Sequence, residues 1–394
     1  MAILILASGC AFAADSDSLL EALEGTKPLI DLRARSEDVG QYGKDEAAEA
    51  DTIRGRFGFQ TGAAWDTSLL AEGVALVPLP SDYNSTLNHQ TQYPTVADPE
   101  QYGLNRLQLL NTSIPRTTLI VGRERINLDD QRFIGSVNWR QLEQTFDAAQ
   151  LINTSIPGLT VDLTYLNRVN RVYGHDSPQG TYPGNNYLAN AAYQTPFGKL
   201  VGFTYILDFD IDPTDSTRTY GARFSGGRSL GLFDLGYSAS YAQQRQNANN
   251  PLRFSDSYYQ GELSAGLQSF RATVGIEVLD GNGTKGFTTP LATLHIFQGW
   301  VDQFLTTPPN GIDDRYASIG YATRRVRLFD SFAATLVYHD FHSQRLGLDY
   351  GTEIDAMLKG SWGKLSALIA YGDYTAKGFA TDTHKLWFEL GYIL

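Results

Sequence analysis

Apolar and polar residues alternate along most of the chain after Leu29, in stretches of about ten residues. In one such stretch Phe233 and Leu235 alternate with Asp234 and Gly236. A period of two residues places successive side chains on opposite faces of a β-strand. The pattern therefore predicts many strands, each with one apolar face and one polar face.

We count about eighteen stretches of this kind. Sixteen is the alternative number, because two of the stretches, 67–78 and 104–112, alternate poorly. The predicted strands are 28–37, 51–61, 67–78, 104–112, 116–124, 143–153, 158–168, 187–195, 198–208, 217–225, 231–243, 257–267, 270–279, 314–323, 331–341, 350–360, 363–372 and 384–394.

Strands of this length suit a membrane, because a tilted strand crosses a bilayer in about 9–11 residues. A soluble β-sandwich or propeller would show the same period. Two features favour the membrane: aromatic residues lie near strand ends, as do Tyr165 and Tyr241, and the polar faces are rich in Gly, Ser and Thr. The predicted fold class is all-β, a single transmembrane antiparallel β-barrel.

The connections between the predicted strands differ in length, as in outer-membrane barrels with short periplasmic turns and long extracellular loops. Short connections include 195–199, 226–230 and 360–363, and long ones include 79–103, 169–186 and 280–313. Within the last loop, the mostly apolar run from Leu291 to Val301 is either a further strand or a segment folded into or over the pore.

Composition excludes several classes of protein. After the N-terminus no window approaches the ~18 apolar residues of a membrane helix, which argues against a helical membrane protein. The net charge of −12 argues against a nucleic-acid binder, which would carry a basic stripe. The single Cys excludes a disulfide scaffold and a CxxC metal cluster.

Residues 1–14 are interpreted as a signal peptide, with 15–394 forming one barrel domain. The apolar run 2–7 precedes Ala11-Phe12-Ala13, a small-x-small cleavage site. The basic n-region is missing, so the signal is incomplete. The alternatives are a buried strand and, because Ala7-Ser8-Gly9-Cys10 loosely resembles an acylation site, a lipoprotein.

Arginine dominates the basic residues of the N-terminal half, since only Lys44 interrupts the twelve arginines between Arg33 and Arg171. Four arginines on the polar phase of neighbouring strands should form a ladder facing the lumen: Arg33, Arg35, Arg54 and Arg56. Arg106 and Arg116 fit the same phase less regularly. A guanidinium group pairs bidentately with carboxylates and suits the transient capture of anions. The alternative is a structural lattice that ties the wall to an inserted loop, and both roles are compatible.

The C-terminal strands place mostly acids on the same phase, with few bases apart from Arg223, Arg271 and Lys359: Asp208, Asp234, Glu262, Glu277, Glu353 and Asp355. We therefore predict a basic wall opposite an acidic wall. Rings of charge set the selectivity of a pore, so this arrangement orients polar solutes and argues against a purely anion-selective pore.

The segment 123–141 is densely charged and begins where a predicted strand ends. We predict that it folds inward or caps a pore mouth, with self-paired charges that hold a constriction; a surface loop is the alternative. Its charged residues and tryptophan are Arg123, Arg125, Asp129, Asp130, Arg132, Trp139 and Arg140.

One stretch, Gly122–Asp147 (GRERINLDDQRFIGSVNWRQLEQTFD), resembles the signature of the alginate-export family of outer-membrane porins. The segments Thr52–Gly62, Asp82–Asn84 and Tyr93–Pro99 are similar to the same family's N-terminal half. The resemblance implies a large monomeric barrel of about eighteen strands in the outer membrane of a Gram-negative bacterium. It also implies passive transport, in the founding example export of an anionic polyuronate through an arginine-lined pore.

The last residues, 385–394, resemble the strand signal read by the barrel-assembly machinery, although that signal usually ends in Phe and this chain ends in Leu394. An ordinary C-terminal strand of a soluble protein is the alternative. The further partners that we expect are membrane lipid, lipopolysaccharide and small hydrophilic or anionic saccharide solutes, with no nucleic acid.

An outer-membrane enzyme is the main rival, and it needs a nucleophile beside a base. The close pair His339 and His342 is interpreted as lumen or rim histidines, and no GxSxG motif occurs. The pieces Asp280–Gly283 and Asp210–Asp212 are read as turns rather than as Ca²⁺ loops. The predicted function is a porin for hydrophilic, anionic solutes, without cofactor, metal or catalytic residues; a general porin, an enzyme barrel and an adhesin are alternatives.

Overall fold

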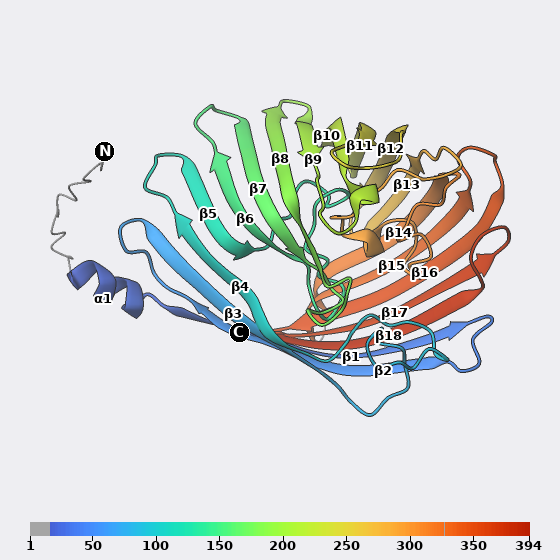
Figure 1. Ribbon diagram of the computed structural model, residues 1–394, viewed down its shortest axis with the longest axis horizontal. Coiled ribbons are helices and arrows are strands. Elements are labelled where there is room, and N and C mark those ends of the chain that lie inside the picture. Colours follow the sequence, from blue (N-terminus) through green and yellow to red (C-terminus); the bar gives the residue numbers. More distant parts are fainter. Residues whose placement is uncertain (1–15, 327) are drawn as a thin grey trace, which may run out of the picture.

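The computed structural model describes residues 16–326 and 328–394, so the predicted signal peptide lies outside the described residues. Eighteen antiparallel strands form one sheet, and the first strand pairs with both the second and the last, which closes the sheet into a barrel (Figure 1). The closed sheet excludes a sandwich or propeller. The larger of the two predicted strand numbers is confirmed, and every predicted stretch contains a strand.

The strands of the first half are β1 (Lys27–Gln41), β2 (Ala48–Gln60), β3 (Thr67–Pro78), β4 (Gln101–Asn111), β5 (Thr117–Glu124), β6 (Thr145–Asn153), β7 (Leu159–Asn170), β8 (Thr181–Thr195) and β9 (Gly198–Ile206). Those of the second half are β10 (Thr217–Leu230), β11 (Phe233–Gln246), β12 (Ser255–Leu267), β13 (Phe270–Leu279), β14 (Ile312–Val326), β15 (Phe329–His342), β16 (Asp349–Trp362), β17 (Leu365–Ala376) and β18 (Thr383–Ile393). Two 3₁₀ turns, η1 (Pro213–Asp215) and η2 (Leu294–Ile296), lie in connections.

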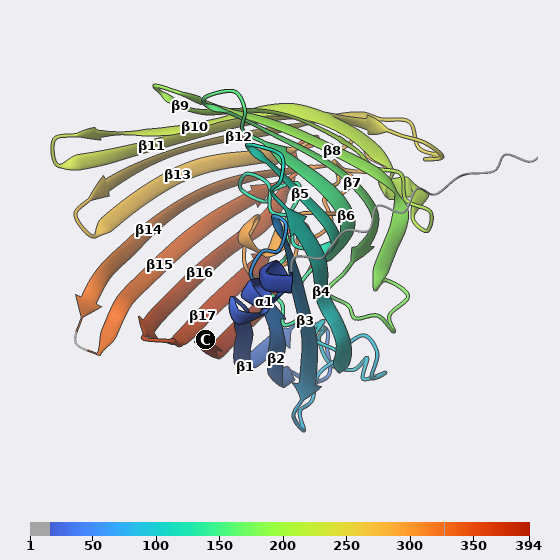
Figure 2. The same ribbon diagram turned by 90° about the vertical axis from the view of Figure 1, so that its left-hand side faces the viewer.

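The two ends of the barrel have different connections. At the end that carries the C-terminus and the start of β1, the strands are joined by tight turns such as 231–232, 268–269 and 363–364; we call this the short-turn end (Figure 2). The opposite, long-loop end carries the connections 79–100, 125–144 and 280–311. The predicted alternation of short turns with long loops is therefore confirmed.

A short helix, α1 (Ser16–Glu24), precedes the barrel and was not predicted. It sits at the short-turn end, where the backbone N–H of Gly62 donates to the carbonyl of Ala22 at 2.9 Å. Its side chains Leu19, Leu20 and Leu23 are exposed. Among the described residues, no helix has the length and apolar character needed to cross a membrane.

The outer face of the wall is apolar, as the alternation predicts. Leu336, Tyr338, Ile354 and Leu358 of neighbouring strands β15 and β16 are all exposed on it. The inner face carries the buried polar and charged side chains. A membrane barrel shows this division, because its outer face meets hydrocarbon and its lumen holds water.

One strand departs from the predicted phase. In β9 the apolar side chains of Val201, Phe203 and Tyr205 are buried and face the lumen, where the ring of Phe133 from the loop 125–144 packs 4.9 Å from that of Phe203. Asp208, which we predicted on the lumen wall, lies beyond the end of β9 in a connection. The physical reason is that an inserted loop gives this part of the lumen an apolar core, so the inner face need not be polar.

Candidate pore constriction

Two long loops fill the lumen near the long-loop end. The loop 125–144 joins β5 to β6, and the loop 280–311 joins β13 to β14; both run inside the ring of strands (Figure 1). They meet at a parallel bridge between Ile134 and Leu291, where the N–H of Gly135 donates to the carbonyl of Leu291 at 2.8 Å. The run from Leu291 to Val301 is thus a loop segment folded into the barrel and not a further strand.

The segment 123–141 is largely inside the lumen, in agreement with the prediction that it folds inward. Ile126 and Ile134 are 1% exposed, and Arg132 is equally buried. The alternative of a surface loop is therefore excluded for most of the segment.

Four predicted ladder arginines do lie side by side on the inner wall. Arg33 and Arg54 are register partners across β1 and β2, with Arg35 and Arg56 two residues further along each strand. All four are at least nine-tenths buried. This placement follows from the period of two, which sends alternate side chains of adjacent strands to the same face.

The loop 125–144 rests on this arginine wall through its backbone carbonyls. Arg33 donates to the carbonyls of Asn138, Trp139 and Arg140 at 3.0–3.2 Å. Arg56 donates to the carbonyl of Gln141 at 3.4 Å, and the guanidinium of Arg35 lies over the Trp139 ring, 4.4 Å from its centroid. A positive wall therefore binds the negative end of the loop's peptide dipoles.

Two carboxylates that were not predicted to line the pore balance the charges of these arginines. Glu389 of β18 pairs with Arg35 at 2.8 Å and with Arg33 at 3.2 Å. Asp31 pairs with Arg54 and, at 3.5 Å, with Arg56. Asp31 shares the alternating phase of Arg33, so its place on the inner wall could have been predicted from the sequence. The place of Glu389 could not, because it depends on the pairing of β18 with β1 in the closed barrel.

A second cluster lies beside the first, where the loop leaves β5. Arg106 pairs with Glu72 at 2.9 Å, and Arg125 pairs with Glu143 at 2.7 Å. The Glu143 carboxylate also lies 3.2 Å from Arg56, which links this cluster to the arginine wall. Arg125 is about a quarter exposed, more than any arginine of the ladder. Of the predicted cations, it offers the most accessible guanidinium beside this wall.

Arg140 joins the two loops to the wall. Its guanidinium contacts Glu37 of β1 at 3.2 Å and Asp302 of the loop 280–311 at 3.0 Å. Asp302 also pairs with Lys385 at 3.3 Å and accepts a hydrogen bond from Nδ1 of His295 at 2.9 Å. The His295 ring in turn stacks on Trp139, with 4.0 Å between centroids.

The loop groups of this junction have shifted pKa values. His295, Lys385 and Arg140 together hold the pKa of Asp302 well below its usual range, although the burial of its side chain acts in the opposite direction. Burial away from water lowers the pKa of His295, so its imidazole is neutral and donates to the carboxylate. Glu37 and Asp302 raise the pKa of Arg140, which stays charged.

The acidic side of the lumen holds the loops by the opposite chemistry. Arg132 pairs with Glu277 of β13 at 2.7 Å and donates to Thr289 and Gln298 at 3.2 Å each. The backbone N–H of Val301 donates to the carboxylate of Glu353 at 2.7 Å. Acidic side chains of this wall thus bind an arginine and a backbone amide of the inserted loops.

The remaining predicted loop acids bridge to strands β9 and β10. Asp130 pairs with Arg223 at 2.7 Å, and Asp129 contacts Lys199 at 3.4 Å. Lys199 is 43% exposed as a side chain and was not predicted; its phase in β9 was obscured by the apolar inner face of that strand. Lys199 is therefore one of the accessible cations at this level of the lumen.

Two predicted pore-lining residues lie elsewhere. Arg116 is exposed in the turn between β4 and β5 at the short-turn end, has a positive φ of 58° and donates to the carbonyl of Ser155. Arg123 is paired across the ladder with Leu107 on the outward phase and binds Asp147 at 2.7 Å. Neither side chain lines the lumen, so both placements are wrong. A turn ends the alternation before Arg116, whereas Arg123 falls on the apolar, outward phase of β5.

The two histidines considered as a catalytic or metal pair are separated by the wall. His339 is buried in the lumen and hydrogen-bonds Asp314 at 2.9 Å, whereas His342 lies on the outward phase. The Asp-rich pieces serve as turns, because Asn282 accepts from the backbone N–H of Thr284 and Asp212 accepts from the hydroxyl of Thr214. These contacts agree with the turn interpretation.

At the long-loop end, a vestibule of about 640 Å³ is lined by the inserted loop 280–311, by the connections 171–180 and 207–216 and by Arg132 of the loop 125–144. Arg171 lies at its side with its guanidinium 4.1 Å from the Tyr182 ring centroid, and Lys285 pairs with Asp215 at 2.9 Å. The vestibule therefore presents cations, an acid and aromatic rings to a solute, and the loop 280–311 itself forms part of its lining.

The barrel is similar to solved outer-membrane proteins of Pseudomonas aeruginosa. The crystal structure of OpdK matches with a TM-score of 0.72 and 17% identity over 94% of this chain and 99% of that chain. OpdK with vanillate matches with a TM-score of 0.73 and 16% identity over 94% and 99%, and OccK3 (OpdO) with 0.70 and 15% over 97% and 99%. No protein-family model and no curated protein matches this chain.

At these identities the likeness concerns the fold. The chain has the closed 18-stranded barrel fold of outer-membrane porins. The neighbours described above are not alginate-export proteins, so of the predicted family resemblance only the coarser part, a porin-type barrel, is confirmed.

Proposed function

We propose that this protein is a channel of the Gram-negative outer membrane through which small hydrophilic anions, such as organic acids or acidic saccharides, diffuse passively. The observation that carries the proposal is a closed barrel narrowed by two inserted loops, which arginines of β1 and β2 hold on one side and acids of β13 and β16 hold on another. Such a constriction selects solutes by size and charge without a chemical step.

The fold of the neighbouring structures supports this role, and one of them was solved with vanillate, a small aromatic carboxylate. In this chain, Arg125, Lys199 and Arg171 present guanidinium or ammonium groups to the lumen or vestibule. We infer that these groups, together with the ladder arginines behind them, raise the local concentration of anions. Guanidinium groups suit this task because they pair with carboxylates and are weakly hydrated.

We infer that the barrel lies among membrane lipids, with the long-loop end outside the cell in contact with lipopolysaccharide and the short-turn end in the periplasm; its apolar outer face and unequal loop lengths support this. The further parts of the proposal are a monomer, a signal peptide at 1–14 ahead of one barrel domain at 15–394, and insertion by the barrel-assembly machinery. An acidic saccharide of the polyuronate class remains the finer alternative to an organic acid as solute, supported only by the resemblance of Gly122–Asp147.

Single-channel recording of the refolded protein in a planar bilayer tests the proposal. A salt gradient gives the ion selectivity, and vanillate or oligouronate is then added to one side. We expect steady conductance and a concentration-dependent block by one of these anions, with a neutral sugar of similar size as the control. Steady conductance without block by either anion would indicate a general porin, and absence of conductance would contradict the channel function.

A further inference from the structure

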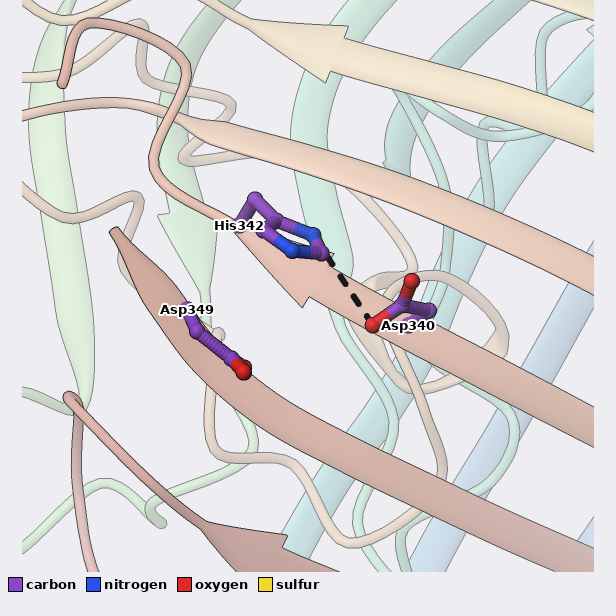
Figure 3. Close-up of side chains that lie close together, drawn as sticks. All are labelled: Asp340, His342 and Asp349. Atoms are coloured by element: carbon purple, nitrogen blue, oxygen red, sulfur yellow. Dashed lines mark ion pairs between the residues drawn. The ribbon is translucent and has the colours of Figure 1, made fainter. Parts of the chain in front are cut away.

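A cluster of metal-binding side chain types lies on the outer surface, away from the lumen. Asp340 and His342 are two residues apart at the end of β15, so they point to the same face. Asp349 begins β16, and a register shift between Phe341 and His342 brings it directly opposite His342 (Figure 3). A local irregularity of the ladder thus assembles three possible ligands at the long-loop end.

The spacing of these three side chains suits one ion. Each offers an atom within 4.8 Å of the atoms offered by the other two. Nδ1 of His342 lies 3.8 Å from the Asp340 carboxylate, which is too far for a hydrogen bond. Zn²⁺ bound at ~2.1 Å holds tetrahedral ligand atoms about 3.4 Å apart, so a small closing movement of these side chains would complete the contacts.

Few positive side chains neutralise the acidic groups of this cluster. Nδ1 of His342 is buried and has no hydrogen-bond partner among the described residues. Arg315, the register partner of Asp340, pairs with Asp313 instead, at 2.9 Å. Lys377 pairs with Asp349 at 2.8 Å but is half exposed. An incoming dication therefore meets one surface ion pair, and exposed pairs of this kind hold weakly.

We propose that Asp340, His342 and Asp349 bind one divalent transition-metal ion, for which Zn²⁺ is the best chemical match. Imidazole nitrogen favours zinc over calcium or magnesium, whereas carboxylates accept all three. Three protein ligands leave a coordination position open to water or to an anion. Bound there, the ion joins β15 to β16 across the loop 343–348, on the outward phase and outside the lumen.

Titration calorimetry on the refolded full chain in detergent, freed of metal by chelation, tests this site with ZnCl₂ as the probe. We expect one saturable site that His342→Ala and Asp349→Asn each weaken at least tenfold. The matched control is His89→Ala, which removes an exposed histidine of the loop 79–100. Lys377→Met should tighten binding, because it releases Asp349 from its ion pair.

Two results would overturn the proposal: Zn²⁺ affinity unchanged by His342→Ala, or Mg²⁺ and Ca²⁺ bound as tightly as Zn²⁺, which would indicate a diffuse acidic surface only. Each variant is first shown to be a folded barrel by its heat-modifiable migration in gels. The conductance of the barrel does not enter this measurement, so the failure of the metal site and the failure of the channel proposal are distinguishable.

Discussion

The two sides of the lumen hold the inserted loops by opposite chemistry. On β1 and β2, arginines donate to the carbonyl oxygens of residues 138–141 in the loop 125–144. On β13 and β16, the carboxylates of Glu277 and Glu353 accept from Arg132 and from the backbone N–H of Val301. The arginines bind carbonyl oxygens, the negative ends of peptide dipoles. The carboxylates bind a guanidinium and a backbone N–H, which are positive.

This difference shows that a charged lumen wall serves two purposes at once. The ladder arginines bind the loop 125–144 and neighbouring carboxylates. The positive charge that a solute can reach therefore comes from residues such as Arg125 and Lys199. The structural lattice and the capture of anions, which the sequence left as alternatives, therefore divide between different residues of the same region.

Arg132→Ala should have the largest effect. It leaves the buried carboxylate of Glu277 unpaired, and breaking one partner of a buried ion pair costs about 3–5 kcal/mol. We expect both loops to loosen on the acidic side and the single-channel conductance to rise with frequent gating. Conductance equal to that of the wild type would show that the loops are held mainly by the arginine wall.

Arg33→Ala should weaken the opposite side, because it removes the donor to three loop carbonyls and one charge of the ladder. Arg33 is buried, so its charge acts on a passing anion across the water of the lumen; at about 1 kcal/mol for such a charge, the anion-to-cation permeability ratio should fall about fivefold. The reversal potential in a salt gradient measures this ratio. Arg125→Ala gives the comparison: a larger fall there would assign selectivity to the accessible cation.

Glu353→Gln should have a smaller effect, since the amide oxygen still accepts from the N–H of Val301 but without the charge. A hydrogen bond to a charged group contributes about 1.5–3 kcal/mol, and only part of this is lost. We expect more frequent brief openings at unchanged main conductance. Glu262→Gln, on the same wall, serves as the control that lowers the charge without touching the loop 280–311.

Acid should release the junction between the loops. The pKa of Asp302 is lowered, and its contribution is lost only below its ordinary pKa of about 3.9. Burial lowers the pKa of His295, so the stability that its neutral imidazole contributes is present above about pH 6.5, the ordinary value for histidine. It declines as pH falls from there, because the undocked state binds protons more readily. Gating should therefore increase between pH 7.5 and pH 5. His295→Asn should remove the part of this dependence nearest pH 6.5.

Arg116→Ala should have no measurable effect on conductance or selectivity. Its side chain lies in an exposed turn at the short-turn end, where its described polar contact is with the carbonyl of Ser155. Exposed contacts of this kind contribute little to stability. A change in ion selectivity would mean that the turn reaches the solute path, in conflict with the geometry.

Alternation along the chain was enough to predict the barrel and the inner face of its arginine ladder. The period of two predicted all eighteen strands, and the phase of Arg33, Arg35, Arg54 and Arg56 predicted a common inner face, because both depend only on alternation along a strand. The inward fold of 123–141 was also predicted from a local feature, the high density of charged residues directly after a predicted strand. Alternation failed at Arg116 and Arg123, where a turn and an outward phase interrupt it.

The partner of each charge depends on contacts between segments that are far apart in the chain. Glu389 reaches Arg33 because the last strand pairs with the first, and Arg132 reaches Glu277 because the loop 125–144 extends inside the barrel to strand β13. The apolar inner face of β9 exists because Phe133 covers it. Such contacts join residues far apart along the chain, and a local pattern carries no information about them until the sheet closes.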